Sequence, residues 1–292
     1  MEVSSPTHPQ QNPSLLQPPL GFEDDDRLRS DYIRALTIEQ VSRAATNCDA
    51  DPVDAPPTIP RTLVRYWHDP DEIPPDVLRC LATWLPLQDE RVKFRFFGDT
   101  AARSYIAEHF DARAVAAFDR CSHPAMRSDF FRMCFILADG GLYVDADDVL
   151  LGHEWRRIFD DHRLLVQPLA YDTDLHSMVP AEDLRNVDLP TRNRIFYVNN
   201  NPIAAPPGHR LMQRALNRAI DTLLRKGSDL EIQSTTGPGN FTASLAAHAR
   251  ALAISGEAAD FQILLDWHAT AEPFWDLEYR NDGRNWRNIG RS

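Results

Sequence analysis

Hydrophobic positions change their spacing several times along the chain, and each spacing predicts a different element. From residue 59 onward, short apolar runs such as 62–69 and 92–99 alternate with stretches of helical periodicity such as 76–85 and 100–110. Strands that alternate with helices indicate an α/β fold with a mainly parallel sheet flanked by helices. Ligands of such sheets bind beyond the carboxyl ends of the strands, so we expect the functional site at that edge.

The second half of the chain is less regular. Residues 194–205 predict a strand that continues into a loop, and residues 210–224 predict a long amphipathic helix. The glycine turn at 236–242 then opens another helix, for which Asn240 or Thr242 is a suitable N-cap. The Trp-rich C-terminal segment has no periodicity from which an element can be predicted.

The first part of the chain differs in composition. Residues 1–24 are rich in Pro, Gln and Ser, so they can bury too little surface to offset the entropy of ordering, and we expect a disordered tail. A modest helix is expected from Asp25, followed by a linker that ends near residue 57. We therefore treat residues 1–57 as an extension of the main domain, residues 58–292, and expect residues 1–50 to be dispensable for folding.

Charge and composition exclude several classes of protein. The net charge of −12 argues against a protein that holds nucleic acid, because binding the phosphate backbone requires a basic patch. No segment approaches the roughly 20 apolar residues of a membrane span, and no signal peptide is present, so we expect a cytoplasmic protein. The four cysteines lack CxxC spacing, which makes zinc or a disulfide framework improbable; they are Cys48, Cys80, Cys121 and Cys134.

The segment 127–148, "RSDFFRMCFILADGGLYVDADD", holds the candidate chemistry. Its helical part is apolar on nearly all sides, and Asp129 and Arg132 are three residues apart on one face, which by itself indicates an intrahelical ion pair. The Gly-Gly pair is expected to end the helix. The strand that follows should turn Asp145 and Asp147 to the same side at two-residue spacing.

Two neighbouring carboxylates repel each other unless a cation lies between them. Hard oxygen ligands favour magnesium, manganese or calcium over zinc. A calcium loop of the EF-hand type is excluded, because Val149 and Leu150 stand where further ligands are needed. A solvated acidic turn remains the alternative if the aspartates are considered alone.

The order of Ser-Asp, Arg one helical turn later, Gly-Gly, Tyr and Asp-x-Asp resembles the sugar-binding DXD region of retaining glycosyltransferases with the GT-A fold. It is most similar to glycosyltransferase family 32, the initiating mannosyltransferases and capsular sugar transferases, with a more distant likeness to the glucosylating toxins. "IPRTLVRYW", "NNPIAAPPGHRLM" and "TGPGNFT" resemble the family's opening strand and two later blocks. The likeness extends from Ile59 to Trp275 and implies a single GT-A catalytic domain.

The resemblance implies roles for the matching positions. Trp67 would stack on the nucleotide base, although packing in the core is an equally good explanation of a lone tryptophan. Asp129 would bind hydroxyls of the donor sugar, and Arg132 would contact the sugar or its diphosphate. Tyr143 would lie on the same side. With Asp145, which would hold the ribose, Asp129 and Arg132 form the candidate catalytic set.

The resemblance also implies a Mn²⁺ or Mg²⁺ cofactor. Asp145 would hold the water shell of the metal and Asp147 would bind the metal directly. Relatives draw a further contact from the C-terminus, for which we favour His268. The other candidates in that region are Trp275, Asn285 and Trp286.

Residues of the later blocks have weaker assignments. Asn201 would lie near the donor or acceptor, or would satisfy loop backbone. Thr236, Gly237 and Thr242 are better explained as a turn and a helix cap, with contacts to the cleft as the second explanation. His209 is expected to be structural.

These observations predict a metal-dependent, retaining glycosyltransferase that moves a hexose from a UDP- or GDP-sugar to a hydroxyl acceptor. The acceptor could be a glycan, a lipid-linked glycan or a protein, and polysaccharide biosynthesis is the expected setting. One alternative is a glycoside hydrolase, which would use two carboxylates but leaves Arg132 without a role. Another is a non-catalytic protein that binds carbohydrate or nucleotide sugar. Assays with nucleotide sugars and with plain glycosides distinguish these classes.

Two substitutions follow from the sequence. Arg132→Ala should lower turnover far more than stability, because the proposed role is neutralisation of the leaving group. Asp147→Asn should weaken metal and donor binding together. Asp148→Asn should have much less effect, because strand alternation is expected to turn that side chain away from the cleft.

Overall fold

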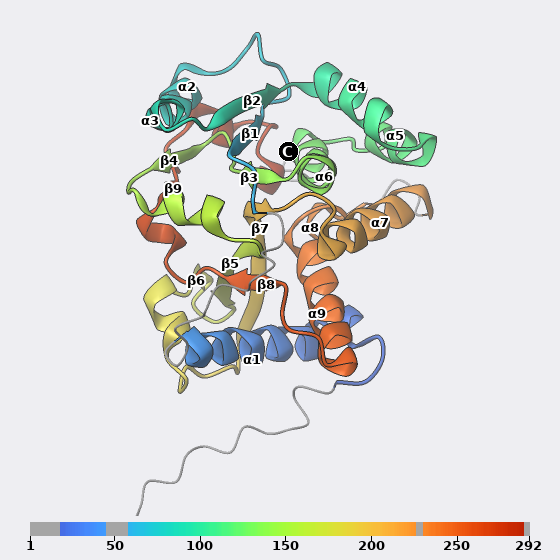
Figure 1. The fold of residues 1–292 in the computed structure, drawn as a ribbon, viewed down its shortest axis with the longest axis vertical. Helices are drawn as coiled ribbons and strands as arrows, with labels where there is room; N and C mark the ends of the chain where they lie inside the picture. Colours follow the sequence, from blue (N-terminus) through green and yellow to red (C-terminus); the bar gives the residue numbers. More distant parts are fainter. Residues whose placement is uncertain (1–17, 45–57, 226–229, 289–292) are drawn as a thin grey trace, which may run out of the picture.

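Seven strands form one sheet at the centre of the protein (Figure 1). The computed structural model describes residues 18–44, 58–225 and 230–288. The strand order is β2-β1-β3-β7-β5-β6, with β8 paired to β5, and β4 and β9 form a separate two-stranded sheet. The strands are β1 Thr62–Tyr66, β2 Lys93–Phe97, β3 Gly141–Tyr143, β4 Asp148–Leu150, β5 Leu164–Asp172, β6 Ser177–Met178, β7 Arg194–Ala205, β8 Phe261–Ile263 and β9 Ala271–Pro273.

The strands of the large sheet mostly point in one direction, as expected. β1 pairs in parallel with β2 and β3, and β5 pairs in parallel with β8. β7 is antiparallel to both β3 and β5, so β5 has the same direction as β3. Among the strands described, β6 and β7 run the opposite way. The mainly parallel sheet is therefore confirmed, with the reversed β7 near its middle.

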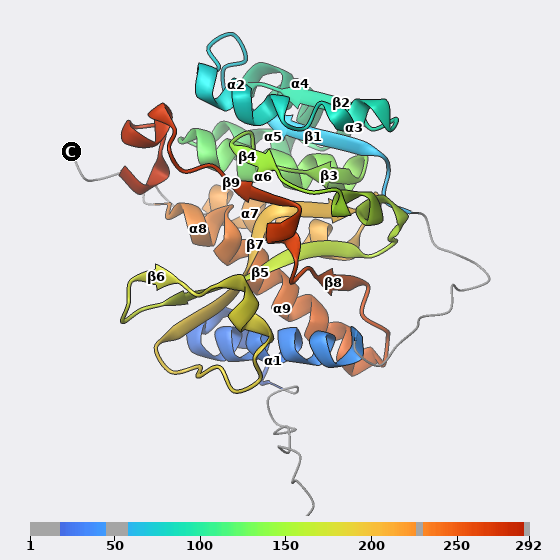
Figure 2. The same ribbon diagram turned by 90° about the vertical axis from the view of Figure 1, so that its left-hand side faces the viewer.

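Helices cover both faces of this sheet (Figures 1 and 2). Helices α4 to α9 lie on one face, α2, α3 and the β4–β9 sheet lie on the other, and α1 packs across the end of β7. The helices are α1 Asp26–Ala44, α2 Pro75–Ala82, α3 Pro86–Asp89, α4 Asp99–His109, α5 Ala112–Asp119, α6 Pro124–Ala138, α7 Arg210–Arg225, α8 Ile232–Thr235 and α9 Pro238–Ser255.

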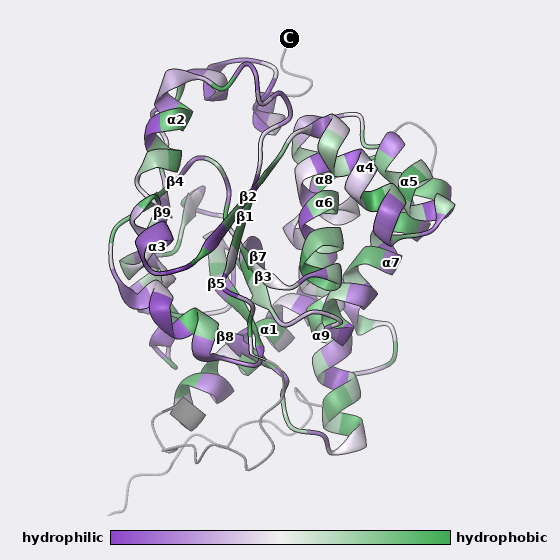
Figure 3. Cartoon of the chain, turned by 45° about the horizontal axis from the view of Figure 1, so that its top comes forward, coloured by the Kyte–Doolittle hydropathy of each residue, from purple (hydrophilic) through white to green (hydrophobic). Residues whose placement is uncertain are grey.

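Each face of the sheet has its own hydrophobic core, because side chains alternate along a strand. Val64 and Tyr143 belong to the core beneath α6, whereas Leu63 and Leu142 belong to the core on the other side. α6 lies against β1, β3 and β7 and is buried around most of its circumference. Figure 3 shows the mainly hydrophobic character of α6 beside more polar outer helices.

The N-terminal segment differs from the sequence prediction. The helix expected from Asp25 is confirmed as α1, but its residues Tyr32, Ile33 and Leu36 belong to the same core as α6 and β7. Phe22 joins them in a short 3₁₀ turn and packs edge-on against Tyr32 with ring centroids 4.9 Å apart. The prediction of disorder is therefore wrong for residues 18–24, and the contacts of α1 argue against a dispensable segment 1–50.

The remaining predictions concern the tail and linker, the cysteines and membrane-spanning helices. Residues 1–17 and the expected linker 45–57 lie outside the described residues, as does Cys48. Cys80, Cys121 and Cys134 are buried thiols without disulfide bonds, as expected. In the part of the chain that the structure describes, no helix is long and apolar enough to cross a membrane.

Candidate active site

The DXD motif occupies a turn between β3 and β4. β3 ends at Tyr143, and the amide of Asp148 donates to the carbonyl of Asp145 at 3.2 Å to close the turn. The prediction that a continuing strand turns Asp145 and Asp147 to one side by alternation is therefore wrong. The turn still holds the two carboxylates close enough for the charge of Asp145 to act on Asp147.

The Gly-Gly pair is required where α6 returns into β3. Gly140 and Gly141 have φ angles of 68° and 113°, a region that side chains rarely adopt. A Cβ atom on Gly141 would lie 2.7 Å from the carbonyl oxygen of Thr62, and one on Gly140 would lie 2.7 Å from the nitrogen of Pro207. These two glycines allow α6 and β3 to bring their polar residues to one place, as the sequence predicted.

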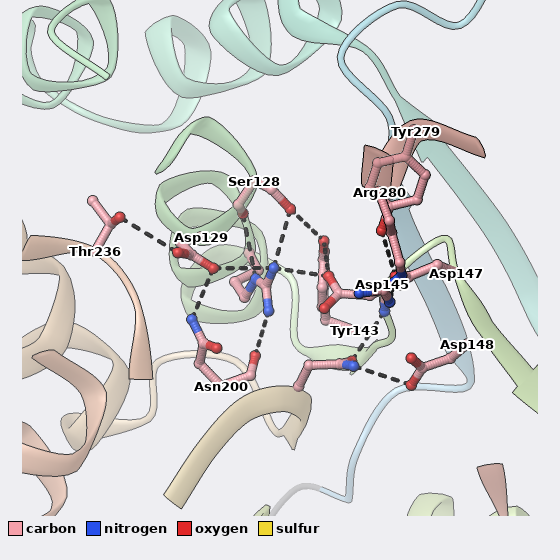
Figure 4. A network of polar contacts seen from close by, with 12 residues as sticks. Ser128, Asp129, Tyr143, Asp145, Asp147, Asp148, Asn200, Thr236, Tyr279 and Arg280 are labelled. Atoms are coloured by element: carbon pink, nitrogen blue, oxygen red, sulfur yellow. Dashed lines mark hydrogen bonds and ion pairs between the residues drawn. The ribbon is translucent and has the colours of Figure 1, made fainter. Parts of the chain in front are cut away.

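Arg132 is the centre of a buried polar network. Figure 4 shows the labelled members Ser128, Asp129 and Asp145. Its guanidinium pairs with Asp129 at 3.1 Å and with Asp145 at 2.8 Å. It also donates to the carbonyl of Asn200 at 2.7 Å and to the hydroxyl of Ser128 at 3.1 Å. Burial alone would lower the pKa of Arg132, but the attraction of Asp145 and the other acidic groups raises it. Arg132 therefore stays charged and joins α6 to the DXD turn.

Asp129 lies on the other side of Arg132 from the DXD turn. Its carboxylate accepts from the side-chain amide of Asn200 at 2.8 Å and from the hydroxyl of Thr236 at 3.4 Å. Burial raises the pKa of Asp129 to about 6, although Arg132 acts in the opposite direction. Gly237 lies against the same carboxylate, because a Cβ atom there would be 3.3 Å from Asp129 Oδ2.

Tyr143 lies beneath Arg132 and is fully buried. The Arg132 guanidinium carbon is 4.3 Å from the centre of its ring. The Tyr143 hydroxyl is hydrogen-bonded to Ser128 at 2.7 Å and donates to Asp145 at 3.1 Å. Tyr143 thus orients Asp145 from below.

The antiparallel register of β3 and β7 brings Asn201 to the DXD turn. Tyr143 is paired with Ile203, so two residues further along Asn201 lies opposite Asp145. The Asn201 side chain accepts from the amide of Asp145 and donates to Asp148 Oδ2, both at 3.0 Å. It therefore holds the first and last residues of the turn.

Asp147 points to a different partner, the C-terminal segment. Its carboxylate accepts from the Tyr279 hydroxyl at 2.5 Å and pairs with the guanidinium of Arg280. Burial and the nearby charge of Asp145 raise the pKa of Asp147, and Arg280 opposes this effect. The two aspartates of the motif are therefore held by different arginines, Asp145 by Arg132 and Asp147 by Arg280.

Asp148 faces the interior, on the side of the sheet that carries Arg65. Burial raises the pKa of Asp148 well above its usual range, whereas burial lowers the pKa of Arg65 to about 10. The Arg65 guanidinium stacks on Trp84 at 4.8 Å, and none of its nitrogens has a hydrogen-bond partner within the described ranges. Asp148 points away from Tyr279 and Arg280, the partners of Asp147. The sequence predicted that Asp148 would point away from the cleft because of strand alternation, whereas its direction is set by the turn.

Trp67 is buried beside the same C-terminal segment. It belongs to a small core with Val77, Ala146 and Leu277. The edge of Tyr279 packs on Trp67, with ring centroids 5.2 Å apart. Its predicted role in stacking on a base stays a prediction.

The structure does not gather His268 with the two aspartates. His268 lies in an exposed 3₁₀ turn, Trp267–Ala269, before β9. In the residues described, no group of three or more His, Cys, Asp or Glu side chains is arranged to hold a metal ion. The metal-binding roles of Asp145, Asp147 and His268 all stay predictions.

Sequence reasoning missed four residues that contact the predicted site residues. Asn200 and Ser128 were visible only as neighbours of predicted site residues, and Tyr279 and Arg280 lie in a segment without periodicity. Thr236 is the C-cap of α8, as expected, and its hydroxyl also contacts Asp129. The prediction that Asn240 or Thr242 caps α9 is wrong, because the N-cap is Gly237 and Thr242 bonds to the backbone of Val198 and Pro238 from inside the helix. His209 is structural, as expected, and caps α7 through the amide of Leu211.

Comparison with known proteins assigns this region to a class. Residues 74–164 match the family model described as "Glycosyltransferase sugar-binding region containing DXD motif", which spans α6, β3 and the DXD turn. A solved structure described as "PaToxG Glycosyltransferase" aligns over 91% of this chain and 96% of its own, with 13% sequence identity and a TM-score of 0.46. No curated protein matches the chain.

Proposed function

We propose that the protein is a metal-dependent, retaining glycosyltransferase that moves a hexose from a UDP- or GDP-sugar to a hydroxyl group of a glycan, a lipid-linked glycan or a protein. The observation that carries this proposal is the arrangement around Arg132. One buried guanidinium ties Asp129 to the first aspartate of the DXD turn, inside the region that matches the sugar-binding family model.

The donor set of the turn fits a hard divalent cation. Asp145 and Asp147 offer carboxylate oxygens, which suit Mn²⁺ or Mg²⁺. Burial and the charge of Asp145 raise the pKa of Asp147, and a cation beside this carboxylate would favour its ionised form. A metal held by these two residues would neutralise the negative charge that develops on the diphosphate when the sugar departs.

The other residues have positioning roles in this proposal. Arg132 fixes the orientation of Asp145 and Asp129, because its nitrogens are already engaged by several partners. Asp129 is buried beside Arg132, and its carboxylate would accept hydrogen bonds from donor-sugar hydroxyls. Asn201 keeps the turn closed from the opposite side. Trp67 is the proposed platform for the nucleotide base.

A screen of donor hydrolysis tests the proposal without knowledge of the acceptor. UDP- and GDP-sugars are incubated with the protein and manganese, and release of the free nucleotide is measured, with plain glycosides as the comparison. We expect release from one class of nucleotide sugar only, and loss of release in a chelator. Hydrolysis of plain glycosides instead would support the hydrolase alternative.

Asp147→Asn is the first prediction, because it removes a charge from the metal site and keeps the shape of the side chain. Affinity for manganese and for the nucleotide should fall together, by about tenfold or more, since the diphosphate shares the metal. Asp148→Asn is the matched control, and it should change manganese affinity much less, because Asp148 faces Asn201 and the interior. Calorimetry on the three proteins measures both affinities. An Asp147→Asn protein that bound manganese like the wild type would contradict the proposed site.

A further inference from the structure

Residues 274–288, the C-terminal strap, lie over the DXD turn. The strap follows β9 and contains the 3₁₀ turns Glu278–Asn281 and Trp286–Asn288. Its amide at Glu278 donates to Asp76 at 2.7 Å, and the carbonyl of Gly283 is 3.1 Å from the His123 ring. Leu277 is buried in the small core around Trp67. The strap is therefore anchored at its start and touches the N-terminus of α6 further on.

The guanidinium of Arg280, within the strap, forms an ion pair with the carboxylate of Asp147. Both side chains of the pair are 13% exposed, so the contact is largely shielded from water. Of the described cationic side chains, Arg280 alone forms an ion pair with Asp147. The same oxygen of Asp147 accepts from Tyr279, so strap residues occupy one whole side of this carboxylate. Figure 4 shows Tyr279 and Arg280 converging on Asp147 from outside the rest of the network.

The surroundings of Arg280 differ from those of Arg132. Arg280 Nε is buried and makes no hydrogen bond within the described ranges. Its guanidinium lies 4.2 Å from the ring of Trp275, a residue that is 58% exposed. Arg132 is fixed by α6, β3 and β7, whereas Arg280 is carried by a short turn with an unused donor. Arg280 can therefore be released from Asp147 at lower cost than Arg132 from Asp145.

We propose that Arg280 and a divalent cation compete for Asp147, and that Arg280 exchanges this carboxylate for the diphosphate of the donor when metal and donor bind. This inference rests on the proposed function. Two cations at one carboxylate oxygen repel each other, so occupation of Asp147 by a metal displaces the guanidinium. A diphosphate beside the metal then offers the displaced guanidinium two or more anionic oxygens, which arginine binds in a forked geometry.

Release of Arg280 would also uncover Trp67. Tyr279 is the neighbour of Arg280 and packs its edge on the Trp67 ring. A movement that takes Arg280 away from Asp147 carries Tyr279 with it, because both belong to one four-residue turn. The predicted metal residue and the predicted base-stacking residue are thus covered by the same turn, and one displacement opens both.

Manganese binding in the absence of nucleotide tests the exchange. Wild type, Arg280→Gln, Arg280→Lys and the control Arg287→Gln are titrated with Mn²⁺ alone, and free manganese is measured by electron paramagnetic resonance. Arg287 stacks on the same Trp275 at 5.0 Å but does not touch Asp147, which makes it a matched control. We expect Arg280→Gln to bind Mn²⁺ about tenfold more tightly than wild type, and both other variants to bind like wild type.

The second arm adds UDP or GDP and follows tryptophan fluorescence. In wild type, manganese with nucleotide should alter the emission, because Trp275 loses its stacked guanidinium. In Arg280→Gln the emission change should be smaller, because only the contact of the base with Trp67 remains, and nucleotide affinity in the presence of saturating manganese should be about tenfold lower than in wild type. Arg280→Lys keeps the charge and should recover part of that affinity.

The outcomes separate this inference from the proposed function. Equal manganese affinity in wild type and Arg280→Gln, with Asp147→Asn clearly weaker, would refute the competition and leave the metal site standing. Weaker manganese binding in Arg280→Gln would refute it as well, since Arg280 would then support the metal. If manganese failed to bind wild type at any concentration that saturates known metal sites of this kind, both the inference and the proposed function would be overturned.

Discussion

Arg132 shows what a buried charge requires in an otherwise apolar helix. It has two carboxylates, a carbonyl and a hydroxyl as partners, and its removal would leave the buried Asp129 and the partly exposed Asp145 without their cation. The sequence suggested that Arg132→Ala would affect turnover far more than stability. The number of buried partners changes this expectation, because breaking a buried ion pair from one side is strongly destabilising.

We therefore predict that Arg132→Ala lowers the free energy of unfolding by about 3–5 kcal/mol. Urea denaturation followed by circular dichroism measures the change. Arg113→Ala is the control, because its ion pair with Asp221 is exposed and should contribute less than about 1 kcal/mol. If both variants unfolded at the same urea concentration, the network would not hold α6 to the DXD turn.

Asp129 should make stability depend on pH. Its pKa rises from an ordinary value of 3.8 to about 6 in the fold, so the folded state favours the protonated form. The contribution of this group is complete below pH 3.8 and is lost as the pH rises through about 6. Relative to Asp129→Asn, wild type should lose roughly 3 kcal/mol of unfolding free energy between pH 4 and pH 7. Parallel stability curves for the two proteins would contradict the raised pKa.

The helix α1 illustrates how an element outside the predicted domain can still complete its core. Ile33 is 1% exposed and lies in the core shared with α6 and β7, whereas Leu28 on the same helix is 42% exposed. We predict that Ile33→Ala destabilises the protein by about 2–5 kcal/mol, while Leu28→Ala stays within about 0.5 kcal/mol. Thermal and urea unfolding of both variants measure the difference. Equal effects would mean that α1 is not part of the cooperative unit.

Several elements could be predicted from their apolar pattern, and others could not. β1, β2 and α6 have clear periodicity, and the position of Asp129 and Arg132 on one face of α6 follows from it. The direction of β7 could not be predicted, because a hydrophobic run is the same in either direction. The partner of Asp147 could not be predicted either, since Tyr279 and Arg280 lie in 3₁₀ turns whose position depends on tertiary contacts.

The predicted disorder of residues 18–24 failed for a similar reason. A window rich in Pro and Gln suggests a tail, but a single aromatic residue is sufficient to fix its last part when a partner is near. Phe22 finds that partner in Tyr32, ten residues later, and both are then buried by the core. A prediction from local composition averages over a window of residues. It therefore underestimates the ordering that one aromatic side chain such as Phe22 provides.

Ligand binding should stabilise the molecule as a whole. A ligand that binds only the folded state, at a concentration 100 times its dissociation constant, adds about 2.7 kcal/mol to the free energy of unfolding. We predict that UDP or GDP with manganese raises the midpoint of thermal unfolding, and that the nucleotide with EDTA does not. Differential scanning calorimetry measures both. A nucleotide effect that persists in EDTA would mean that binding does not use a metal.

The contact between the strap and the DXD turn also bears on the order in which the protein is synthesised. Asp147 and the Tyr279 that covers it are 132 residues apart in the chain. The ribosome therefore exposes the aspartates long before their partners exist, and a nascent chain must carry an unneutralised acidic turn for most of that interval. Premature termination between residue 164 and Tyr279 would release a chain with the whole segment that matches the family model but no cover for its DXD turn, so such fragments should be recognised and degraded as incomplete.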